Sequence, residues 1–404
     1  MQSVVIIGAS HAATEAIATL RKLGWSDKII LIGDEPHLPY HRPPLSKAFL
    51  KGDLSTDKLL IRPESFYQKH DVELHLSRRA VEIDRPTNCV NLDNGDQIQY
   101  QHLILATGTR ARKLPLDGAD SDRVHYLRTL RDVEAIQAKL TTGTKMLIIG
   151  AGYIGLEVAA SALELGCQVT VLEAMERVLA RVTSQTVSEF YQQVHRNAGV
   201  DLRLNASVTG FMHGPTSSQA ELGDGAKIEF DIALVGIGVL PNTELAASAG
   251  LVCDNGIKVN EHAQTNDPHI YAVGDCSYHH NPFYNRHVRL ESVPNAVEQA
   301  KTAASSICGQ AIVYDQLPWF WSDQYDLKLQ TAGLCEGYDQ LVIRGDQAAH
   351  KFSVFYLQAG HIIAVDAINS PADFMLGKKL ILSRVTPSVD ELSNPDVPLK
   401  SLLD

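Results

Sequence analysis

The 404-residue sequence predicts an α/β protein in which two parallel-sheet units are followed by a smaller α+β domain. Two observations carry this prediction. The succession of apolar run, glycine turn, helical run and second apolar run occurs at residues 3–33 and again at 145–173. The last quarter of the chain changes to β-branched and aromatic runs, which favour an antiparallel sheet.

The first unit begins with a β-branched run at residues 3–7, which predicts a strand. Residues 12–23 have helical spacing up to Gly24, a suitable C-cap. The run from Lys28 predicts a second strand that ends in acidic residues. Strands joined through a helix in this way are parallel neighbours.

The second unit repeats this order. Its strand at 145–150 leads to a predicted helix at 153–165, which Gly166 stops, and then to a strand that ends at Glu173. Further apolar runs that lead into glycine are found at residues 102–110, 231–242 and 269–277. Continuous apolar runs indicate strands that are covered on both faces.

The C-terminal quarter predicts a separate domain. A helix entered through Pro294 and starting at Asn295 precedes it. Two strand-like runs meet at Ala359 and Gly360 and predict an antiparallel hairpin, and a final helix is expected over residues 372–383.

Composition restricts the function classes. Hydrophobic residues make up 45% and charged residues 21% of the chain, as in globular proteins of two or three domains. No apolar run approaches the roughly 18 residues of a membrane helix, and a signal peptide has no room before Ser3, so we expect a cytoplasmic protein without a membrane partner. The net charge of −11 argues against nucleic acid as the main partner.

The six cysteines are scattered, and the two nearest in sequence are Cys253 and Cys276. This spacing contains no local redox pair and no compact zinc knuckle, so we predict no metal site. We expect thiols that are buried in a protein of a reducing compartment.

The second glycine turn fits the GxGxxG pattern between a strand and a helix, which predicts dinucleotide binding. Glycines let the backbone approach a diphosphate, and the helix N-terminus favours its charge. Glu173 follows about 20 residues later and can accept both ribose hydroxyls of NAD, whereas it would repel the 2′-phosphate of NADP. We therefore favour NADH, although the nearby Arg177 could weaken this preference.

The first glycine turn departs from the pattern, because Ser10 and Ala13 replace its second and third glycines after Gly8. A serine Cβ is tolerated there if φ stays negative. Either Asp34 or Glu35 can supply the ribose carboxylate, and His11 is interpreted as a helix first-turn residue without a catalytic role. Two dinucleotide turns suggest a tightly held, non-covalent FAD and an exchanging NADH that passes it a hydride.

The chain resembles the FAD-dependent, NADH-using ferredoxin reductases of bacterial oxygenase systems. The resemblance covers nearly the whole chain and rests on the segments PYHRPPLSKAFL, LILATGTR, YLRTL, GAGYIGLEVAA, YAVGDC, ESVPNAVEQA and PWFWSDQY. It implies a glutathione-reductase-like fold. The implied domains are an FAD domain at 1–112 and 244–318, an NAD domain at 113–243 and a C-terminal interface domain at 319–404.

The resemblance also implies roles for single residues. Lys47 and Glu157 correspond to the pair beside the reactive flavin edge, where an ammonium favours negative charge on the ring. Asp275 corresponds to the acid that binds the FAD ribityl chain, and Val293 and Pro294 open a helix aimed at the flavin. The predicted FAD-binding residues are Gly8, Ser10, Ala12, Ala13, Asp34, Glu35, Arg42, Lys47, Val81, Ala106, Thr107, Gly108, Arg128, Gly274, Asp275, Val293, Pro294 and Trp321. The predicted NAD-binding residues are Gly150, Gly152, Tyr153, Ile154, Gly155, Glu157, Glu173 and Gly238. Trp319 and Gln324 resemble further residues beside the flavin ring, with ordinary core packing as the alternative.

The electron acceptor implied by the resemblance is a small [2Fe–2S] ferredoxin that serves a cytochrome P450 or a Rieske oxygenase. Since no cysteine pair can relay electrons, they should pass from the flavin directly to this protein. Ferredoxins of this kind are typically acidic, so docking needs a locally basic face, for which family analogy offers Arg62, Lys301 and Lys328. We expect a monomer or a homodimer.

Two alternatives remain open at this stage. A flavoprotein that reduces a quinone, monodehydroascorbate or oxygen would share the same flavin core. A regulatory relative of the apoptosis-inducing type would need a basic nucleic-acid surface and a targeting segment, and the sequence predicts neither.

Overall fold

The computed structural model describes residues 3–403 and divides into two compact units, which are treated separately below. Unit 1 consists of Met1–His41, Thr56–Arg110 and Val239–Pro318. Unit 2 consists of Arg42–Ser55, Ala111–Gly238 and Trp319–Asp404. The predicted boundaries of three domains stay a prediction. Along residues 3–403, no helix is both long and apolar enough to cross a bilayer.

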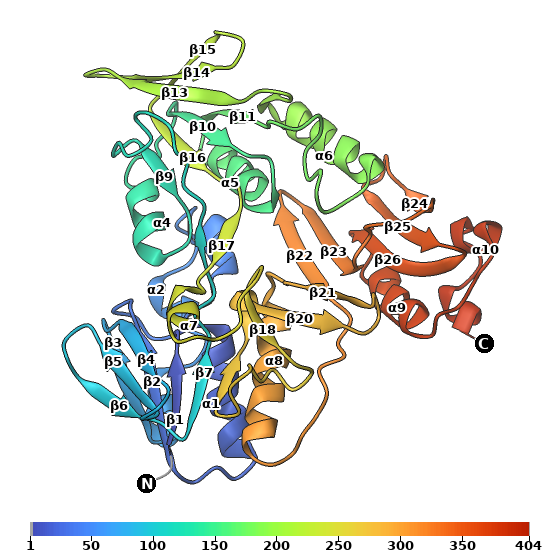
Figure 1. Ribbon diagram of the computed structural model, residues 1–404. Coiled ribbons are helices and arrows are strands. Elements are labelled where there is room, and N and C mark those ends of the chain that lie inside the picture. Colours follow the sequence, from blue (N-terminus) through green and yellow to red (C-terminus); the bar gives the residue numbers. More distant parts are fainter. Residues whose placement is uncertain (1–2, 404) are drawn as a thin grey trace. The chain divides into compact units, whose positions relative to one another are not determined.

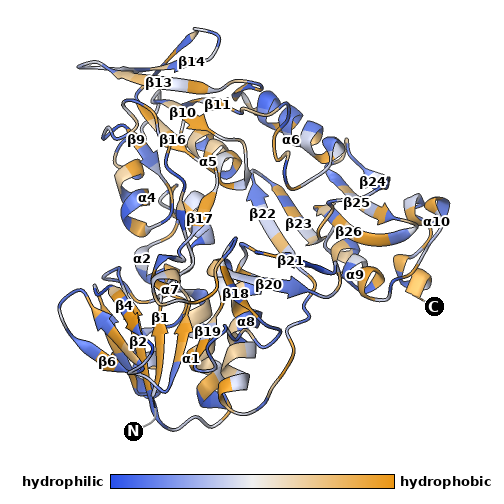
Figure 2. Cartoon of the chain, viewed as in Figure 1, coloured by the Kyte–Doolittle hydropathy of each residue, from blue (hydrophilic) through white to orange (hydrophobic). Residues whose placement is uncertain are grey.

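Unit 1 is built on a five-stranded parallel sheet in the order β19-β7-β1-β2-β3 (Figure 1). Its strands are β1 (Ser3–Ile7), β2 (Lys28–Gly33), β3 (Val72–Leu76), β7 (His102–Leu105) and β19 (Ile270–Ala272). The residues of β1 are all buried, and the sheet strands are coloured apolar in Figure 2. This confirms the prediction of parallel strands that are covered on both faces.

One face of this sheet is covered by the helices α1 (His11–Lys22) and α8 (Val293–Ile307), which pack through buried alanines. The other face is covered by a three-stranded antiparallel meander of β4 (Ala80–Asp84), β5 (Cys89–Leu92) and β6 (Gln97–Gln99). Ile83, Val90 and Ile98 of the meander join the apolar cluster under the sheet.

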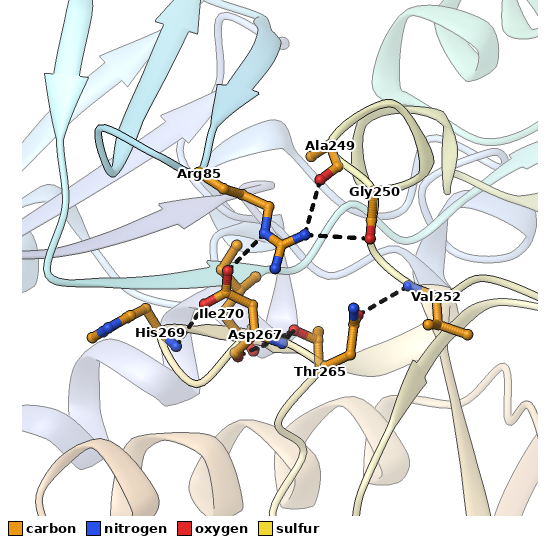
Figure 3. A network of polar contacts seen from close by, with 9 residues as sticks. Arg85, Ala249, Gly250, Val252, Thr265, Asp267, His269 and Ile270 are labelled. Atoms are coloured by element: carbon orange, nitrogen blue, oxygen red, sulfur yellow. Dashed lines mark hydrogen bonds and ion pairs between the residues drawn. The ribbon is translucent and has the colours of Figure 1, made fainter.

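Arg85 follows β4 in the turn to β5 and connects this meander to the segment before β19 (Figure 3). Its Nε donates to Asp267 Oδ2 at 2.7 Å, and its Nη1 donates to the carbonyl oxygens of Ala249 and Gly250 at 3.3 Å each. Asp267 in turn accepts a hydrogen bond from the His269 backbone at 2.9 Å. The ion pair therefore fixes the turn from which β19 enters the sheet.

Unit 2 repeats this architecture. Its parallel sheet has the order β12-β11-β10-β16-β9, in which β16, β10, β11 and β12 correspond to β7, β1, β2 and β3 of unit 1. The fifth strand differs, because β9 precedes β10 in the chain whereas β19 follows β7. The strands are β9 (Val124–Tyr126), β10 (Lys145–Ile149), β11 (Gln168–Leu172), β12 (Asp201–Arg203) and β16 (Ile232–Val235). A second antiparallel meander is formed by β13 (Val208–His213), β14 (Ser218–Leu222) and β15 (Lys227–Phe230). The helices of this part are α4 (Leu130–Gln137), α5 (Tyr153–Glu164) and α6 (Gln185–Ala198).

The C-terminal part of unit 2 is a five-stranded antiparallel sheet in the order β22-β23-β26-β25-β24. The strands are β22 (Trp319–Gln324), β23 (Leu327–Gly333), β24 (Gln340–Asp346), β25 (Lys351–Gln358) and β26 (His361–Ile368), followed by α9 (Pro371–Leu382), α10 (Val389–Ser393) and η3 (Leu399–Leu403). The predicted hairpin is confirmed, because Ala359 and Gly360 turn between β25 and β26 with φ of 50° and 80°.

Short elements complete the chain. They are η1 (Pro43–Ser46), α2 (Thr56–Leu59), α3 (Glu64–Lys69), β8 (Thr109–Ala111), β17 (Val239–Pro241), α7 (Glu244–Ser248), β18 (Ile257–Val259), η2 (Gly274–Cys276), β20 (Ser277–Asn281) and β21 (Arg286–Val288). The α/β class with two parallel sheets and a C-terminal α+β part is therefore confirmed.

A buried carboxyl group joins the C-terminal sheet to α6 within unit 2. Asp366 Oδ2 on β26 accepts hydrogen bonds from Thr183 Oγ1 and Tyr356 Oη, each at 2.5 Å. All three side chains are buried. Burial raises the pKa of Asp366 to about 6, since two hydroxyl donors offset only part of the lost hydration.

We predict that Asp366 makes the unfolding of the protein pH-dependent. The carboxyl is protonated in both states only well below its ordinary pKa of 3.8. As the pH rises from about 4 to about 6 the unfolded chain gives up this proton before the folded protein does, and above pH 6 the folded protein holds a buried charge that costs about 3 kcal/mol. Stability from this group is thus lost as the pH rises through 6. In Asp366→Asn, the melting temperature relative to wild type should increase between pH 4.5 and pH 8, roughly by several degrees.

The exposed Asp326 offers a matched control. Asp326→Asn should follow the wild-type pH profile of the melting temperature. An Asp366→Asn profile parallel to wild type would contradict the prediction.

Candidate functional site

The glycine turn of unit 1 connects β1 to α1, and its first glycine has a steric cause. Gly8 has φ of +110°, and a Cβ at this position would lie 2.1 Å from the carbonyl oxygen of Ala106. Its backbone N–H donates to Ile32 O at 2.8 Å. Only glycine permits this approach between the turn and the end of β7.

Ser10 occupies the place of the second glycine without strain, because its φ of −150° and ψ of −153° are extended backbone. Its side chain makes no capping hydrogen bond to α1 and instead lies 3.4 Å from His11 Nδ1. The first-turn N–H groups of α1 are therefore left without a side-chain cap, which suits a diphosphate. His11 is buried with its Nε2 3.1 Å from His41 Nδ1, in a packed first turn.

The glycine turn of unit 2 repeats this geometry between β10 and α5. Gly150 has φ of +102°, and a Cβ there would lie 2.4 Å from Gly236 O, at the end of β16. At Gly155 a Cβ would lie 2.0 Å from Gly150 O. A Cβ at Gly152 would meet no protein atom within 4 Å and would project into open space in front of the helix. Open space of this kind would let a dinucleotide approach the backbone.

Glu173 follows β11 directly and reaches back to the turn. Its Oε2 accepts from the Ala151 backbone at 2.7 Å, and its Oε1 accepts from the Met175 backbone at 2.9 Å. The guanidinium of Arg177 donates to Thr183 O, Ala180 O and Ser188 Oγ at 2.7–2.9 Å. Because these contacts bind Arg177 to its own loop and to α6, it offers little to a 2′-phosphate.

In unit 1 the candidate ribose carboxylates, Asp34 and Glu35, lie one and two residues beyond the position equivalent to Glu173. Ile32 pairs with Ile7 as Leu172 pairs with Ile149, so Gly33 stands where unit 2 has Glu173. A Cβ at Gly33 would lie 2.7 Å from Ala9 Cβ, which explains why the acidic residues follow it. Glu35 accepts from Tyr40 Oη at 2.6 Å, and Asp34 pairs with Arg79 at 3.4 Å.

Two further loops of unit 1 carry predicted FAD residues. Thr107 and Gly108 are fixed by Asn242, whose Nδ2 donates to Thr107 O at 2.8 Å and whose N–H donates to Gly108 O at 3.0 Å. Buried Gln299 on α8 accepts from the Gly274 backbone at 2.8 Å, which holds the loop that presents Asp275. The Thr109 hydroxyl donates to Asp275 Oδ2 at 3.3 Å.

The beginning of α8 lies in the same unit. Val293 and Pro294 are its first residues, and the Ser292 hydroxyl caps it by accepting from the Asn295 backbone at 3.3 Å. Val81 lies on β4 with 52% of its surface exposed. Each of these residues lies in unit 1, together with Gly8, Ser10, Ala12 and Ala13.

The predicted pair of Lys47 and Glu157 is formed in unit 2. Lys47 Nζ lies 2.6 Å from Glu157 Oε2, and the carboxylate is 2% exposed. Glu157 Oε2 also accepts from Ser46 Oγ at 2.5 Å, and its Oε1 accepts from Ser322 Oγ at 2.7 Å. A buried carboxylate of this kind requires a countercharge and donors, and here it has one ammonium and two hydroxyls.

The contacts of the other predicted binding residues of unit 2 are as follows. Arg42 Nη1 donates to Arg128 O at 2.8 Å, so these two FAD candidates adjoin. The ring of Tyr153 contacts that of Phe320 in a tilted arrangement with centroids 4.7 Å apart, and the rings of Trp319 and Trp321 lie 5.8 Å apart. Ile154 is exposed, and Gly238 has φ of +99° with the Arg181 guanidinium 3.5 Å from its Cβ position.

Gln324, predicted to lie beside the flavin ring, is enclosed by protein in this structure. It is 1% exposed, and its amide forms hydrogen bonds to Ser322 and His195.

The predicted docking residues are divided between the units. Arg62, beside the Phe66 ring, and Lys301, paired with Glu298 at 2.7 Å, lie in unit 1, and Lys328 lies on β23 in unit 2.

None of the cysteines is set up as a redox nucleophile. All six are free, and burial raises the pKa of each thiol, in the case of Cys335 to about 12. Thiolate is the reactive form, so a disulfide relay has no starting point here.

Sequence reasoning missed four residues that form hydrogen bonds to predicted site residues: Ser46 and Ser322, which bind Glu157, His195, which binds Gln324, and Gln299, which binds the Gly274 backbone. Ser46, Ser322 and Gln299 lie inside the segments PPLSK, PWFWSDQY and ESVPNAVEQA, and a search of these motifs for buried hydroxyls and amides could have found them. His195 is in a helical segment that carries no motif.

Comparison with known proteins places the whole chain. Residues 2–300 match the family model for pyridine nucleotide-disulphide oxidoreductases, and residues 319–403 match the model for the reductase C-terminal domain. Putidaredoxin reductase of Pseudomonas putida is 43% identical over 407 residues, covering 99% of this chain and 96% of the relative. Rhodocoxin reductase of Rhodococcus erythropolis is 42% identical, with coverage of 98% and 93%.

We predict that Gly152→Ala and Gly155→Ala separate dinucleotide binding from folding. Because the added Cβ of Gly152→Ala projects into open space, the melting temperature should stay near wild type while the Kd for NADH rises by about ten-fold, the cost of ~1.4 kcal/mol. Gly155→Ala places its Cβ 2.0 Å from a carbonyl oxygen and should lower the melting temperature. Titration of each variant with NADH and a thermal melt test this. Unchanged NADH affinity in Gly152→Ala would refute the assignment of this turn.

The solved structures agree with the sequence comparison. The covalent complex of putidaredoxin reductase with putidaredoxin contains a chain that matches with a TM-score of 0.96 at 43% identity, covering 100% of this chain and 98% of that one. Family models, sequence relatives and fold coincide over the same residues, and such relatives use FAD and NAD(P)H. The chain belongs to the pyridine nucleotide-disulphide oxidoreductases with a reductase C-terminal domain, the family of putidaredoxin reductase.

Proposed function

We propose that this chain is an FAD-dependent NADH:ferredoxin oxidoreductase, which takes a hydride from NADH and delivers single electrons to a [2Fe–2S] ferredoxin. The observation that carries the proposal is the duplication of one glycine turn on two parallel sheets that share the order of four of their strands. One turn for a resident dinucleotide and one for an exchanging dinucleotide account for both. FAD, when bound, accepts two electrons as hydride and releases them one at a time.

Residues of unit 1 fit a tightly held, non-covalent FAD. The uncapped start of α1 and the Gly8 turn suit the diphosphate, and Glu35 or Asp34 suits the adenosine ribose. Asp275 is presented by a loop that Gln299 anchors, as a ribityl contact requires. The capped start of α8 offers a positive dipole end to the flavin.

Residues of unit 2 fit NADH rather than NADPH. Glu173 stands at the turn with its carboxylate fixed by two backbone donors, and further lone pairs remain for ribose hydroxyls. A 2′-phosphate would meet this negative charge, while the donors of Arg177 are bound to its own loop. Lys47 holds a positive charge beside Glu157, which suits the charge that develops when the flavin is reduced.

The acceptor is supported by the relatives and by the thiols. The most similar relatives reported above are named as reductases of putidaredoxin and rhodocoxin. With six unpaired cysteines of raised pKa, this chain has no disulfide route, so electrons leave directly for another protein. We place the ferredoxin upstream of a cytochrome P450 or a Rieske oxygenase in the reducing cytoplasm.

We predict that the purified protein reduces cytochrome c with NADH only when a candidate ferredoxin is added. Single electrons reach the haem through the iron–sulfur protein, so the rate should rise with ferredoxin concentration and saturate. The absorbance of reduced cytochrome c measures it. An equal rate without ferredoxin would favour a small-molecule acceptor such as a quinone and would sink the proposal.

Docking should depend on local positive charge. Because an acidic ferredoxin meets a chain with a net charge of −11, we expect Arg62→Glu, Lys301→Glu and Lys328→Glu each to lower the ferredoxin-dependent rate by about ten-fold at low salt. The difference should shrink at high salt, since exposed charges are screened.

Lys227→Glu, on the meander strand β15, is the matched control with the same change in net charge. It should keep the wild-type rate, and every variant should keep the rate of NADH oxidation by a small dye. Equal losses in the ferredoxin and dye assays would count against docking at these residues.

A further inference from the structure

Four polar side chains of unit 2 form a series of hydrogen bonds that begins at Glu157. Ser322 and Gln324 lie on β22, Tyr325 follows this strand, and His195 is in the last turn of α6. Ser322 and His195 are fully buried, and Gln324 is 1% exposed. Polar groups at such depth persist only when each finds a partner.

Consecutive hydrogen bonds join these groups to the carboxylate. Ser322 Oγ lies 2.7 Å from Glu157 Oε1, and Gln324 Nε2 lies 3.2 Å from Ser322 Oγ. Gln324 Oε1 is 2.8 Å from His195 Nε2, and the other ring nitrogen of His195 is 3.1 Å from Tyr325 Oη. The chain therefore extends from a half-buried phenol to the partner of Lys47.

The chemistry of the groups fixes the direction of every donor. The carboxylate of the ion pair carries no proton, so Ser322 must donate to Glu157, and its oxygen then accepts from the amide nitrogen of Gln324. The amide oxygen of Gln324 therefore faces His195 and requires a proton on Nε2. A neutral imidazole then accepts at Nδ1, so Tyr325 donates to His195.

The buried environment agrees with this neutral tautomer. Burial lowers the pKa of His195, and Gln324 offsets only part of that effect. Tyr325 is held at φ of 55°, in the left-handed region, at the hairpin turn between β22 and β23. Its hydroxyl contact to His195 anchors a backbone conformation that a tyrosine rarely adopts.

We propose that His195, Gln324 and Ser322 form a positioning relay that orients Glu157 and, through it, Lys47. All four hydrogen bonds donate toward Oε1 of Glu157, and hydrogen bonds aligned in this way polarise one another. Ser46 and Lys47 bind the other oxygen, so the carboxylate cannot rotate without breaking contacts on both sides. The consequence for the reaction rests on the proposed function.

A pair of His195 variants tests the relay. His195→Gln keeps an N–H near the position of Nε2, whereas His195→Leu keeps volume and loses the donor. We expect anaerobic bleaching of bound flavin by NADH to slow by about ten-fold in His195→Leu and in Ser322→Ala, because either change interrupts the series of hydrogen bonds that orients Oε1 of Glu157. The KM for NADH should stay unchanged, and His195→Gln should recover most of the rate.

Ser353→Ala is the matched control, since Ser353 is also fully buried in the same antiparallel sheet but bonds to Asp373. It should reduce flavin at the wild-type rate. Melting temperature and FAD content are measured for every variant, so a folding defect is recognised. Equal rates in His195→Leu, His195→Gln and Ser353→Ala would overturn the relay.

A second measurement does not depend on turnover. In ¹⁵N-histidine-labelled protein, the His195 signals, assigned by their absence from His195→Gln, should show a protonated Nε2 and an unprotonated Nδ1 at neutral pH. A proton on Nδ1 would overturn the donor direction. If wild-type flavin is not bleached by NADH, the proposed function fails while this tautomer still decides the relay. Bleaching that is insensitive to the relay variants rejects the relay alone.

Discussion

The close approach of a glycine to a strand-end carbonyl is the constraint on which this structure depends. Gly8 faces Ala106 O in unit 1, and Gly150 faces Gly236 O in unit 2, each at a distance that no Cβ can occupy. The approach lets a helix begin directly at the edge of a parallel sheet, with its first N–H groups open. Two such starts in one chain are the physical basis for assigning two dinucleotides to it.

Two buried carboxyl groups of unit 2, Glu157 and Asp366, differ in how the cost of burying them is offset. Glu157 is almost fully buried, and the cost of burying its charge is offset by Lys47 and by two hydroxyls, Ser46 of η1 and Ser322 of β22. Asp366 differs in that its side-chain partners among residues 3–403 are two hydroxyls and not an ammonium, and burial raises its pKa. A paired carboxylate can keep a positive charge in place, whereas an unpaired one responds to pH.

Much of this could be predicted from the sequence because local rules govern it. The glycine spacing predicted both turns, the β-branched and aromatic runs on either side of Ala359 predicted the hairpin, and Ser10 is tolerated at negative φ as expected. His195 could not be predicted, because it lies in no motif and bonds to a partner far along the chain, Gln324. Only folding brings such donors and acceptors together.

The most direct test of the central claim is the visible spectrum of the purified protein under anaerobic NADH. If unit 1 holds FAD and unit 2 admits NADH, the protein is yellow or can be made so with FAD, and stoichiometric NADH bleaches it. Colourless protein that does not take up FAD, or a yellow protein that NADH leaves unbleached, would contradict the account.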